Sequence, residues 1–355
     1  MITRMKILMV GLGGIGQRHV RNLRELFGDK IEILAYRVRG LKQTLTDTLK
    51  VEEGVDLEQK YQITSYRQWE EALGQKPEVV FVTNPSSLHI DIALQAAERG
   101  CHLFIEKPLS HTLEGADRLI NLVEKKDLIA FVGYPLRFHP GLKQVHSLLE
   151  QKAIGTLLSA RLVVGEYLPN WHTYEDYRQM YAAREELGGG VILSQIHEFD
   201  YAYWLFGMPR RIFALGGKLS HLEIDVEDTA STLMECGVNG RKMPVHVHQD
   251  FVQRPSHRTC EIMGEEGRIL WDYHAGTVQV FSATKKEAQI YPLSEFKRNQ
   301  LFIDELKHFF DCLERNEKPL VTIQDGVNSL KIALAARRSL KTGKVVEIAQ
   351  TERET

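Results

Sequence analysis

Residues 5–16 read MKILMVGLGGIG, an apolar run that ends in a glycine-rich turn. A near-continuous apolar run is typical of a strand buried on both faces of a parallel sheet. The glycines are spaced Gly11-x-Gly13-x-x-Gly16, and apolar residues then recur at helical spacing as far as Leu26. This order of strand, turn and helix predicts the first corner of a doubly wound α/β domain.

Strands and helices continue to alternate through the first 135 residues. We expect further parallel strands at residues 31–37, 79–83, 101–105 and 129–134, with amphipathic helices between them. Such repeated strand–helix–strand units predict a parallel sheet with right-handed crossovers, the Rossmann arrangement. The sequence therefore predicts a dinucleotide-binding Rossmann domain over residues 1–130.

Beyond residue 150 short strands follow one another with few helices between. They are predicted at residues 158–165, 211–218, 229–236, 244–252, 258–263, 268–272 and 277–281, and residues 264–267 predict a hairpin turn. This pattern favours a mostly antiparallel open sheet of six or seven strands within a second domain, residues 131–355, which ends in helices. One face of such a sheet packs on helices and the other meets solvent or a second subunit, so we expect a homo-oligomer.

Composition narrows the class of protein. The 355 residues include 45 basic and 47 acidic side chains, a formal charge of -2, which argues against nucleic acid or an anionic membrane as the partner. We find no apolar run near the ~18 residues that span a bilayer, and no cleavable leader is expected. The four cysteines show no C-x-x-C spacing, so buried thiols and a cytoplasmic location are expected.

The glycine turn predicts a bound dinucleotide. Gly11 makes the turn, Gly13 lets the backbone approach a diphosphate, and Gly16 lets the helix lie close to the strand. Gly14 and Ile15 open that helix, whose free N–H groups and positive dipole favour phosphate. The alternative is a glycine-rich turn that binds nothing.

The next strand predicts which dinucleotide binds. NAD enzymes usually carry an acidic residue at its end, but here residues 35–39 read AYRVR. Arg37 and Arg39 are suited to hold a 2′-phosphate, so NADP is favoured slightly over NAD. Alternatively, both arginines are solvated surface charges.

Residues 101–110 read CHLFIEKPLS, which places Glu106 and Lys107 where a strand runs out into a loop. An ammonium group at this edge can bind an alcohol or carbonyl oxygen and stabilise charge on it as hydride leaves. With the glycine turn, Lys107 predicts a nicotinamide-dependent oxidoreductase. The alternative is an ordinary surface pair of opposite charges.

A candidate acid/base residue lies after Gly188-Gly189-Gly190. Residues 191–200 are predicted to form one helix opened by a flexible loop, with Ser194, His197 and Asp200 on one face. His197 can exchange the proton that accompanies hydride transfer, although a structural histidine is the alternative. His246 and His248 share a strand face, but with no third ligand in view we expect no metal.

In this order the landmarks resemble the glucose-fructose oxidoreductase, inositol dehydrogenase and rhizopine-catabolism family, Gfo/Idh/MocA. The matching segments are residues 11–16 (GLGGIG), 83–89 (TNPSSLH), 106–108 (EKP), 134–138 (YPLRF), 188–190 (GGG), 197–200 (HEFD) and 225–228 (DVED). The resemblance spans about residues 5–346. It implies a Rossmann domain joined to an open sheet, sheets that pair in homodimers or homotetramers, and redox chemistry at a secondary alcohol of a sugar, polyol or nucleotide sugar.

The resemblance also implies roles for individual residues. Lys107 would polarise the reacting oxygen and His197 would be the acid/base. The nicotinamide half of the cofactor would be lined by Thr83, Asn84, Pro85, His89 and Glu106. Further contacts with a sugar-like substrate are expected from Tyr134, Arg137, Trp171, Tyr174 and Arg178.

Two departures from the family pattern stand out. Ser194 lies where many members keep an aspartate beside the histidine, and Pro135 lies where asparagine is common. A serine cannot support an imidazolium electrostatically, so Glu198 or Asp200 would supply the carboxylate, or Lys107 would carry more of the proton transfer. Two alternative functions remain: a cofactor-binding regulator without chemistry, and an enzyme that keeps its cofactor as an internal hydride shuttle.

Overall fold

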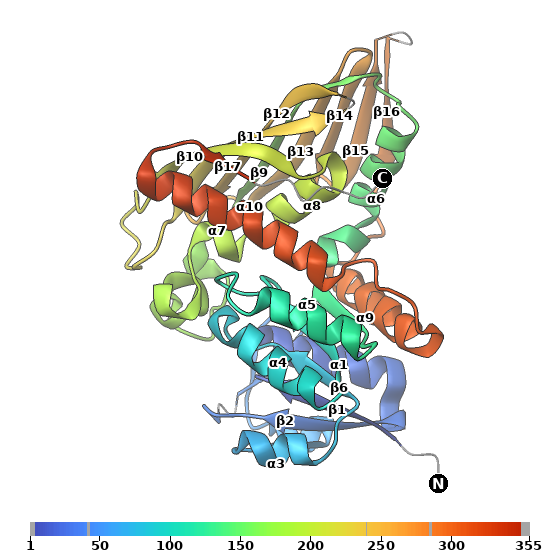
Figure 1. Ribbon diagram of the computed structural model, residues 1–355, viewed down its shortest axis with the longest axis vertical. Helices are drawn as coiled ribbons and strands as arrows, with labels where there is room; N and C mark the ends of the chain where they lie inside the picture. The colour runs from blue at the N-terminus through green and yellow to red at the C-terminus, as the bar shows by residue number, and fades with distance from the viewer. Residues whose placement is uncertain (1–3, 41–42, 239, 284–285, 349–355) are drawn as a thin grey trace.

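The computed structural model describes residues 4–40, 43–238, 240–283 and 286–348. Two sheets dominate the molecule (Figure 1), a six-stranded sheet built from the N-terminal part of the chain and a nine-stranded sheet built from the C-terminal part. None of the helices in these described ranges is long and apolar enough to cross a membrane.

The six-stranded sheet has the strand order β5-β2-β1-β6-β7-β8, and every neighbouring pair is parallel. Its strands are β1 (Met5–Val10), β2 (Ile31–Tyr36), β5 (Ile63–Tyr66), β6 (Val79–Val82), β7 (His102–Glu106) and β8 (Ala130–Gly133). The helices of this region are α1 (Gly14–Phe27), α2 (Leu57–Tyr61), α3 (Trp69–Gly74), α4 (His89–Glu98) and α5 (Ala116–Lys125), and a small ladder joins β3 (Thr44–Leu45) to β4 (Val51–Glu52). The predicted doubly wound Rossmann sheet is confirmed, with β5 as an additional strand.

The strand order reverses between β1 and β6, which lie side by side. Ligands of open α/β sheets bind at the carboxyl ends of the strands at this reversal. Gly11 follows β1, Thr83 follows β6, and Lys107 follows the next strand, β7. The three segments predicted to carry chemistry therefore lie along one edge of the sheet.

The nine-stranded sheet has the order β16-β15-β14-β13-β9-β12-β11-β10-β17. Its strands are β9 (Leu157–Gly165), β10 (Pro209–Gly217), β11 (Thr229–Val238), β12 (Arg241–Asp250), β13 (His257–Gly264), β14 (Gly267–Asp272), β15 (Thr277–Ser282), β16 (Glu287–Pro292) and β17 (Val346–Glu347). Only the pair β9–β12 is parallel, so the predicted mostly antiparallel sheet is confirmed. The predicted strand number was too low because β16 is a polar edge strand and β17 has two residues.

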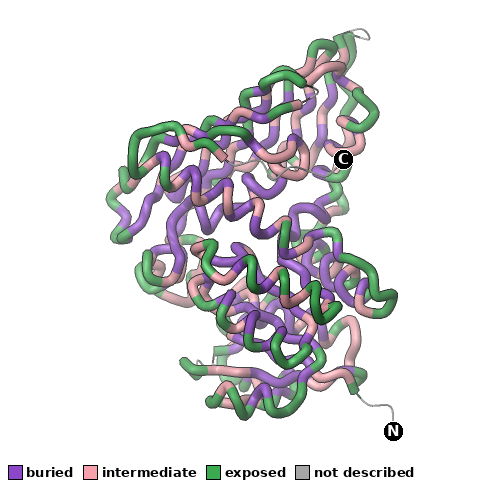
Figure 2. The backbone as a smooth tube through the Cα atoms, viewed as in Figure 1, coloured by how far each residue is buried: buried purple, intermediate pink, exposed green. Residues whose placement is uncertain are grey.

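Helices cover one face of this sheet and leave the other open (Figures 1 and 2). The long helix α10 (Ile323–Thr342) packs on β10 and on α8 (His197–Phe206), and it also reaches β8 of the first sheet. Several large apolar side chains remain exposed on the sheet, among them Leu215 (62%), Leu233 (50%) and Ile290 (55%).

Helix α9 (Arg298–Arg315) completes the core of the first sheet, although it belongs to the C-terminal part of the chain. It packs against α1, and the ring of Phe309 lies edge-on to Phe81 and Phe104 at 6.0 and 5.6 Å between centroids. Helix α6 (Pro140–Glu150), which also belongs to the C-terminal part, packs on β14 and β15. The core around the first sheet therefore includes a helix from the C-terminal part of the chain.

Candidate active site

The glycine turn is shaped for close approach of backbone and ligand. Gly11 has φ +95°, and a Cβ on Gly16 would lie 2.3 Å from the carbonyl oxygen of Gly11, so neither position accommodates a larger residue. A Cβ on Gly13, by contrast, would meet no atom within 4 Å. The N-cap residue Gly13 has no side chain to cap the N-terminus of α1. The predicted diphosphate cradle fits the geometry.

The loop after β6 contributes one polar atom without a partner. Thr83 Oγ1 donates to the carbonyl oxygen of Gly11 at 2.7 Å, so its hydroxyl fastens the glycine turn. Asn84 Oδ1 is buried and has no hydrogen-bond partner in the described residues. Buried acceptors are normally hydrogen-bonded, and a bound cofactor would supply the missing donor.

His89 fastens the two loops that flank the site. Its ring nitrogens lie 2.9 Å from the carbonyl oxygen of Pro108 and 2.8 Å from that of Asn84. Burial lowers the pKa of His89, and the hydrogen bonds to the two carbonyl oxygens oppose this effect. His89 therefore holds the loop after β6 against the loop that carries Lys107, which places it behind the site.

Lys107 points from the end of β7 toward the helical layer of the second sheet. Its Nζ donates to the carbonyl oxygen of Ser194 at 2.8 Å. Glu106 takes a different direction, because its Oε1 lies 2.7 Å from Nε2 of His19 on α1. The side chain of Lys107 therefore faces the second sheet, whereas that of Glu106 faces α1.

The predicted single helix over residues 191–200 is wrong. The chain forms α7 (Val191–Ser194) and α8 (His197–Phe206), with a break at residues 195–196. The break turns the carbonyl of Ser194 toward Lys107 and starts α8 at His197. Ser194 Oγ is buried without a partner in the described residues, so its hydroxyl does not support His197 here.

The glycine triplet before α7 is closely packed, so the expectation of a flexible loop is also wrong. A Cβ on Gly188 would lie 2.5 Å from Ser86 Oγ, and one on Gly190 would lie 2.3 Å from an oxygen of Glu227. Gly188 and Gly190 also have φ of +82° and +101°. These glycines bring α7 close to the loop after β6.

His197 lies among cations. Burial and the positive charges of Lys107, Arg258 and Arg298 hold the pKa of His197 well below its ordinary value. Nδ1 of His197 has no hydrogen-bond partner in the described residues, and the ring lies edge-on to Tyr134 at 5.9 Å. His197 is therefore a neutral imidazole near pH 7, able to accept a proton.

Neither neighbouring carboxylate replaces the missing aspartate. Glu198 is fully buried and pairs with Arg258 at 2.9 Å. Burial raises the pKa of Glu198 to about 7, against the opposing effect of Arg258. Asp200 accepts two hydrogen bonds from Arg137, at 3.0 and 2.8 Å, and one from Ser329. Both carboxylates are engaged away from His197.

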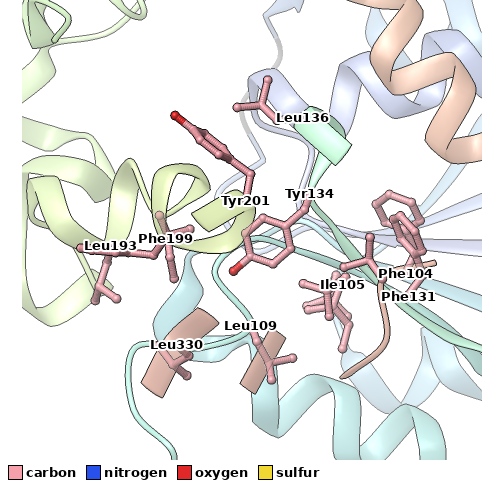
Figure 3. Close-up of a cluster of buried hydrophobic side chains, with 14 of the residues drawn as sticks. Phe104, Ile105, Leu109, Phe131, Tyr134, Leu136, Leu193, Phe199, Tyr201 and Leu330 are labelled. Atoms are coloured by element: carbon pink, nitrogen blue, oxygen red, sulfur yellow. The ribbon is translucent and has the colours of Figure 1, made fainter. Parts of the chain in front are cut away.

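Two expected substrate residues lie in the core. Arg137 is 3% exposed and bonded to Asp200, and Tyr134 is fully buried. Figure 3 shows the Tyr134 ring among apolar side chains that include Ile105 and Leu109. These residues support the site from behind: Arg137 fixes α8, and Tyr134 packs against His197.

Three of the expected substrate residues lie in the segment over residues 166–184, and each has a different environment. Trp171 is partly buried and lies edge-on to Phe251 at 5.3 Å. Arg178 is exposed and hydrogen-bonded to Asp176 and Glu223. Tyr174 reaches the other domain, where its hydroxyl oxygen lies 2.9 Å from the position of a Cβ on Gly14 and is hydrogen-bonded by the Gly14 backbone.

At the end of β2 the two arginines differ. Nη1 of Arg37 forms an ion pair with Glu58 at 2.7 Å. Arg39 is exposed. On the second sheet, His248 contacts Ser231 and Asp250 rather than joining His246 in a three-ligand cluster.

Sequence reasoning missed one group entirely. His19, Glu106 and Glu305 are buried and come together beneath the end of β7. No spacing signal connects Glu305 to Glu106, because they lie on different elements far apart in the sequence. Only the apolar neighbours of Glu305 in residues 301–310 (LFIDELKHFF) marked it as a polar residue on a buried helix face.

Comparisons with known proteins agree with this geometry. Residues 5–134 match the family model GFO_IDH_MocA, described as an oxidoreductase family with an NAD-binding Rossmann fold, and residues 142–270 match the GFO/IDH/MocA C-terminal domain. The chain is 27% identical to myo-inositol 2-dehydrogenase of Thermotoga maritima, over 98% of this chain and 99% of that protein. It is 24% identical to scyllo-inositol 2-dehydrogenase (NAD(+)) of Bacillus subtilis, over 97% and 96%.

A similar fold occurs in a solved structure of levoglucosan dehydrogenase in complex with NADH and levoglucosan. The TM-score is 0.80 at 20% identity, and the match covers 98% of this chain and all of the other. Two consecutive family matches, the Rossmann sheet with its glycine cradle and the Lys107 edge lead to the same conclusion. The chain belongs to the GFO/IDH/MocA family of oxidoreductases.

Proposed function

We propose that the protein transfers a hydride between a nicotinamide dinucleotide and a secondary alcohol or ketone of a sugar or polyol. The carrying observation is the ammonium group of Lys107 at the carboxyl edge of β7, held by Ser194 beside the open glycine cradle. The curated relatives support the substrate class, because those cited above are named as inositol dehydrogenases.

Each residue has its own role in the proposed reaction. The bound cofactor supplies the hydride acceptor or donor. Gly13 and the N-terminus of α1 would hold its diphosphate, and Asn84 Oδ1 would accept a hydrogen bond from a donor on the cofactor. Lys107 binds the reacting oxygen and stabilises the negative charge that develops on it.

A proton must leave the alcohol as it is oxidised. Burial and the cations around it hold the pKa of His197 low, so the imidazole is neutral near pH 7 and has an unprotonated nitrogen that can accept the proton as a weak base. In the opposite direction the same path runs in reverse: the protonated imidazole of His197 returns the proton to the oxygen as hydride arrives, and the ammonium of Lys107 again stabilises the charge. We propose Trp171 as the apolar surface for the substrate ring, whereas Arg137 and Tyr134 act from the core.

The ion pair of Arg37 bears on cofactor choice. A 2′-phosphate would have to compete with Glu58 for that guanidinium, so we propose NAD(H) ahead of NADP(H). Glu58→Gln removes the competing charge and is expected to tighten NADPH binding about fivefold, which is ~1 kcal/mol, with NADH binding unchanged. Calorimetric titration measures both affinities. Glu70→Gln, at an exposed pair with Arg99, is the control, and unchanged NADPH affinity in Glu58→Gln would remove Arg37 from the cofactor site.

Tyr174 occupies a position that the diphosphate needs, because its hydroxyl takes a hydrogen bond from the backbone of Gly14. Tyr174→Phe deletes this competitor and is expected to tighten NADH binding about fivefold, the effect of one hydrogen bond of ~1 kcal/mol. Stopped-flow and calorimetric titrations with NADH measure the change. Tyr177→Phe is the matched control, since its hydroxyl contacts Glu223 instead. Weaker binding in Tyr174→Phe would show that the hydroxyl binds the cofactor.

We also propose that the open face of the nine-stranded sheet pairs with a second copy, giving a homodimer or homotetramer. Exposed apolar side chains lie on this sheet in two places: Leu215 and Leu233 are on the neighbouring strands β10 and β11, and Ile290 is on the edge strand β16. Burying such a surface on a second copy is favourable at ~25 cal/mol per Å².

The proposed function is tested in two steps. Calorimetry with NADH and NADPH, after checking by absorbance for cofactor retained through purification, establishes which dinucleotide binds. Purified protein is then mixed with the oxidised form of that dinucleotide and with inositols, other polyols, sugars or nucleotide sugars. Reduction of the dinucleotide is the measured quantity. Cofactor binding without turnover on any alcohol or ketone would contradict the proposal and favour a regulator.

A further inference from the structure

We propose that Glu305 is a positioning residue that carries a proton near neutral pH, hydrogen-bonds into the His19–Glu106 pair and thereby fixes the strand end that bears Lys107. The network of these buried groups stands on geometry alone. Its consequence for Lys107 rests on the proposed function.

Three ionisable side chains from three elements meet in the core. His19 comes from α1, Glu106 from the end of β7 and Glu305 from α9. One ligand-type atom from each lies within 4.8 Å of the other two. His19 and Glu305 are 0% exposed and Glu106 is 7% exposed. Such a group is unusual beneath a parallel sheet, where apolar contacts are the rule.

The hydrogen bonds within the group are incomplete. Nε2 of His19 and Oε1 of Glu106 lie 2.7 Å apart. Both carboxyl oxygens of Glu305 and Nδ1 of His19 have no hydrogen-bond partner in the described parts of the chain. Buried polar groups without partners are rare, so each calls for a proton, an ion or water.

A proton on Glu305 would remove the charge from a carboxyl group whose two oxygens are buried without a partner in the described residues. An isolated carboxylate in this environment is strongly disfavoured, since the rings of Phe104 and Phe302 lie 4.9 and 6.2 Å from that of His19. Burial, and then the charge of Glu106, hold the pKa of Glu305 well above its ordinary value. The neutral acid has an O–H to donate to the carboxylate of Glu106.

The surrounding charges favour keeping the negative charge on Glu106. Arg18 on α1 interacts electrostatically with Glu106 and with Arg298 at the start of α9. Glu305 itself is affected by one charged neighbour, Glu106. The proton therefore belongs on Glu305, and the charge on Glu106.

The network ends at the backbone of Lys107. Oε2 of Glu106 accepts a hydrogen bond from the backbone N–H of Lys107 at 3.3 Å. Fixing this carboxylate from below thus fixes the peptide from which the Lys107 side chain leaves the sheet. Displacements of about 1 Å at a reacting group are enough to slow an enzyme 10²-fold.

The test compares Glu305→Gln and Glu305→Leu with the wild type. Glutamine keeps a donor without a titratable proton, and leucine keeps the volume without a donor. Glu314→Gln, exposed on the same helix, is the control. At pH 8 the infrared carbonyl band of a protonated carboxyl is expected in the wild type and the control and lost in both Glu305 variants. Thermal unfolding is expected to show that Glu305→Leu is at least as stable as the wild type, since a buried carboxyl is removed.

The kinetic readout separates positioning from folding. With an alcohol found in the screen, Glu305→Leu is expected to lose about tenfold in kcat with unchanged NADH affinity, and Glu305→Gln to stay within about twofold of the wild type. Full kcat in a folded Glu305→Leu would overturn the positioning role. An infrared band that is unchanged in both variants would show that Glu305 is ionised, and it would overturn the assignment of a proton to this residue.

A divalent cation bound by the same three side chains is the rival occupant. Elemental analysis showing one metal per chain, with loss of thermal stability on chelation in the wild type and not in Glu305→Leu, would overturn the proposal in its favour. Failure of the proposed function looks different: no alcohol is turned over, yet the infrared band and its loss in the variants remain.

Discussion

Replacing Lys107 with methionine is expected to lower kcat about 10³-fold while NADH affinity stays within about twofold. Removal of one group that stabilises developing charge on oxygen costs about 10²–10³ in kcat. Methionine preserves the length of the side chain, so the backbone fixed by Glu106 is retained. Steady-state kinetics on the alcohol from the screen, with calorimetry for NADH, measure the two quantities.

Ser194→Ala is the matched control for this prediction. Lys107 bonds the carbonyl of Ser194, not its hydroxyl, so alanine leaves the contact in place. Its kcat is expected within about threefold of the wild type, because Ser194 Oγ makes no hydrogen bond in the described structure. A loss in Ser194→Ala as large as in Lys107→Met would place the hydroxyl in the proton path. Unchanged turnover in Lys107→Met would remove Lys107 from the chemistry.

The first sheet was predictable because its signals are local. A strand buried on both faces, a glycine turn and an amphipathic helix each show in a short window of sequence, as residues 5–16 illustrate. The missed elements lack such signals. β16 (Glu287–Pro292) is exposed along most of its length, so no apolar alternation marks it. The packing of α9 on α1 joins distant segments, which periodicity cannot report.

The sequence could place a site residue only where that residue lies at the end of its own strand. Gly11 and Lys107 follow strands, and the edge of a parallel sheet brings them together. Arg137 was expected at the substrate, but its partner Asp200 lies on another helix, and the pair is buried. The break before His197 was missed because residues 191–206 remain apolar and helical in pattern across it.

His197→Gln is expected to lower kcat for alcohol oxidation about 10²-fold, the loss of a general base. Glutamine approximates the size of the ring and cannot accept a proton near neutral pH. The variant is expected to keep its fold, because Nδ1 of His197 has no partner in the described residues whose bond would be lost. Pre-steady-state measurement of cofactor reduction isolates this step. His146→Gln, at the partly exposed pair with Glu150, is the control and is expected to match the wild type.

The pH dependence of oxidation follows from the same environment. A base whose pKa is held low stays unprotonated until the pH falls below that pKa, so the acidic limb of the wild-type profile is expected well below pH 6.5. Lys107 is the largest charged contributor to this lowering. Lys107→Met is therefore expected to raise the pKa of His197, observed by NMR titration of the imidazole, which needs no turnover. An imidazole that titrates at the same pH in both proteins would show that Lys107 and His197 do not share a site.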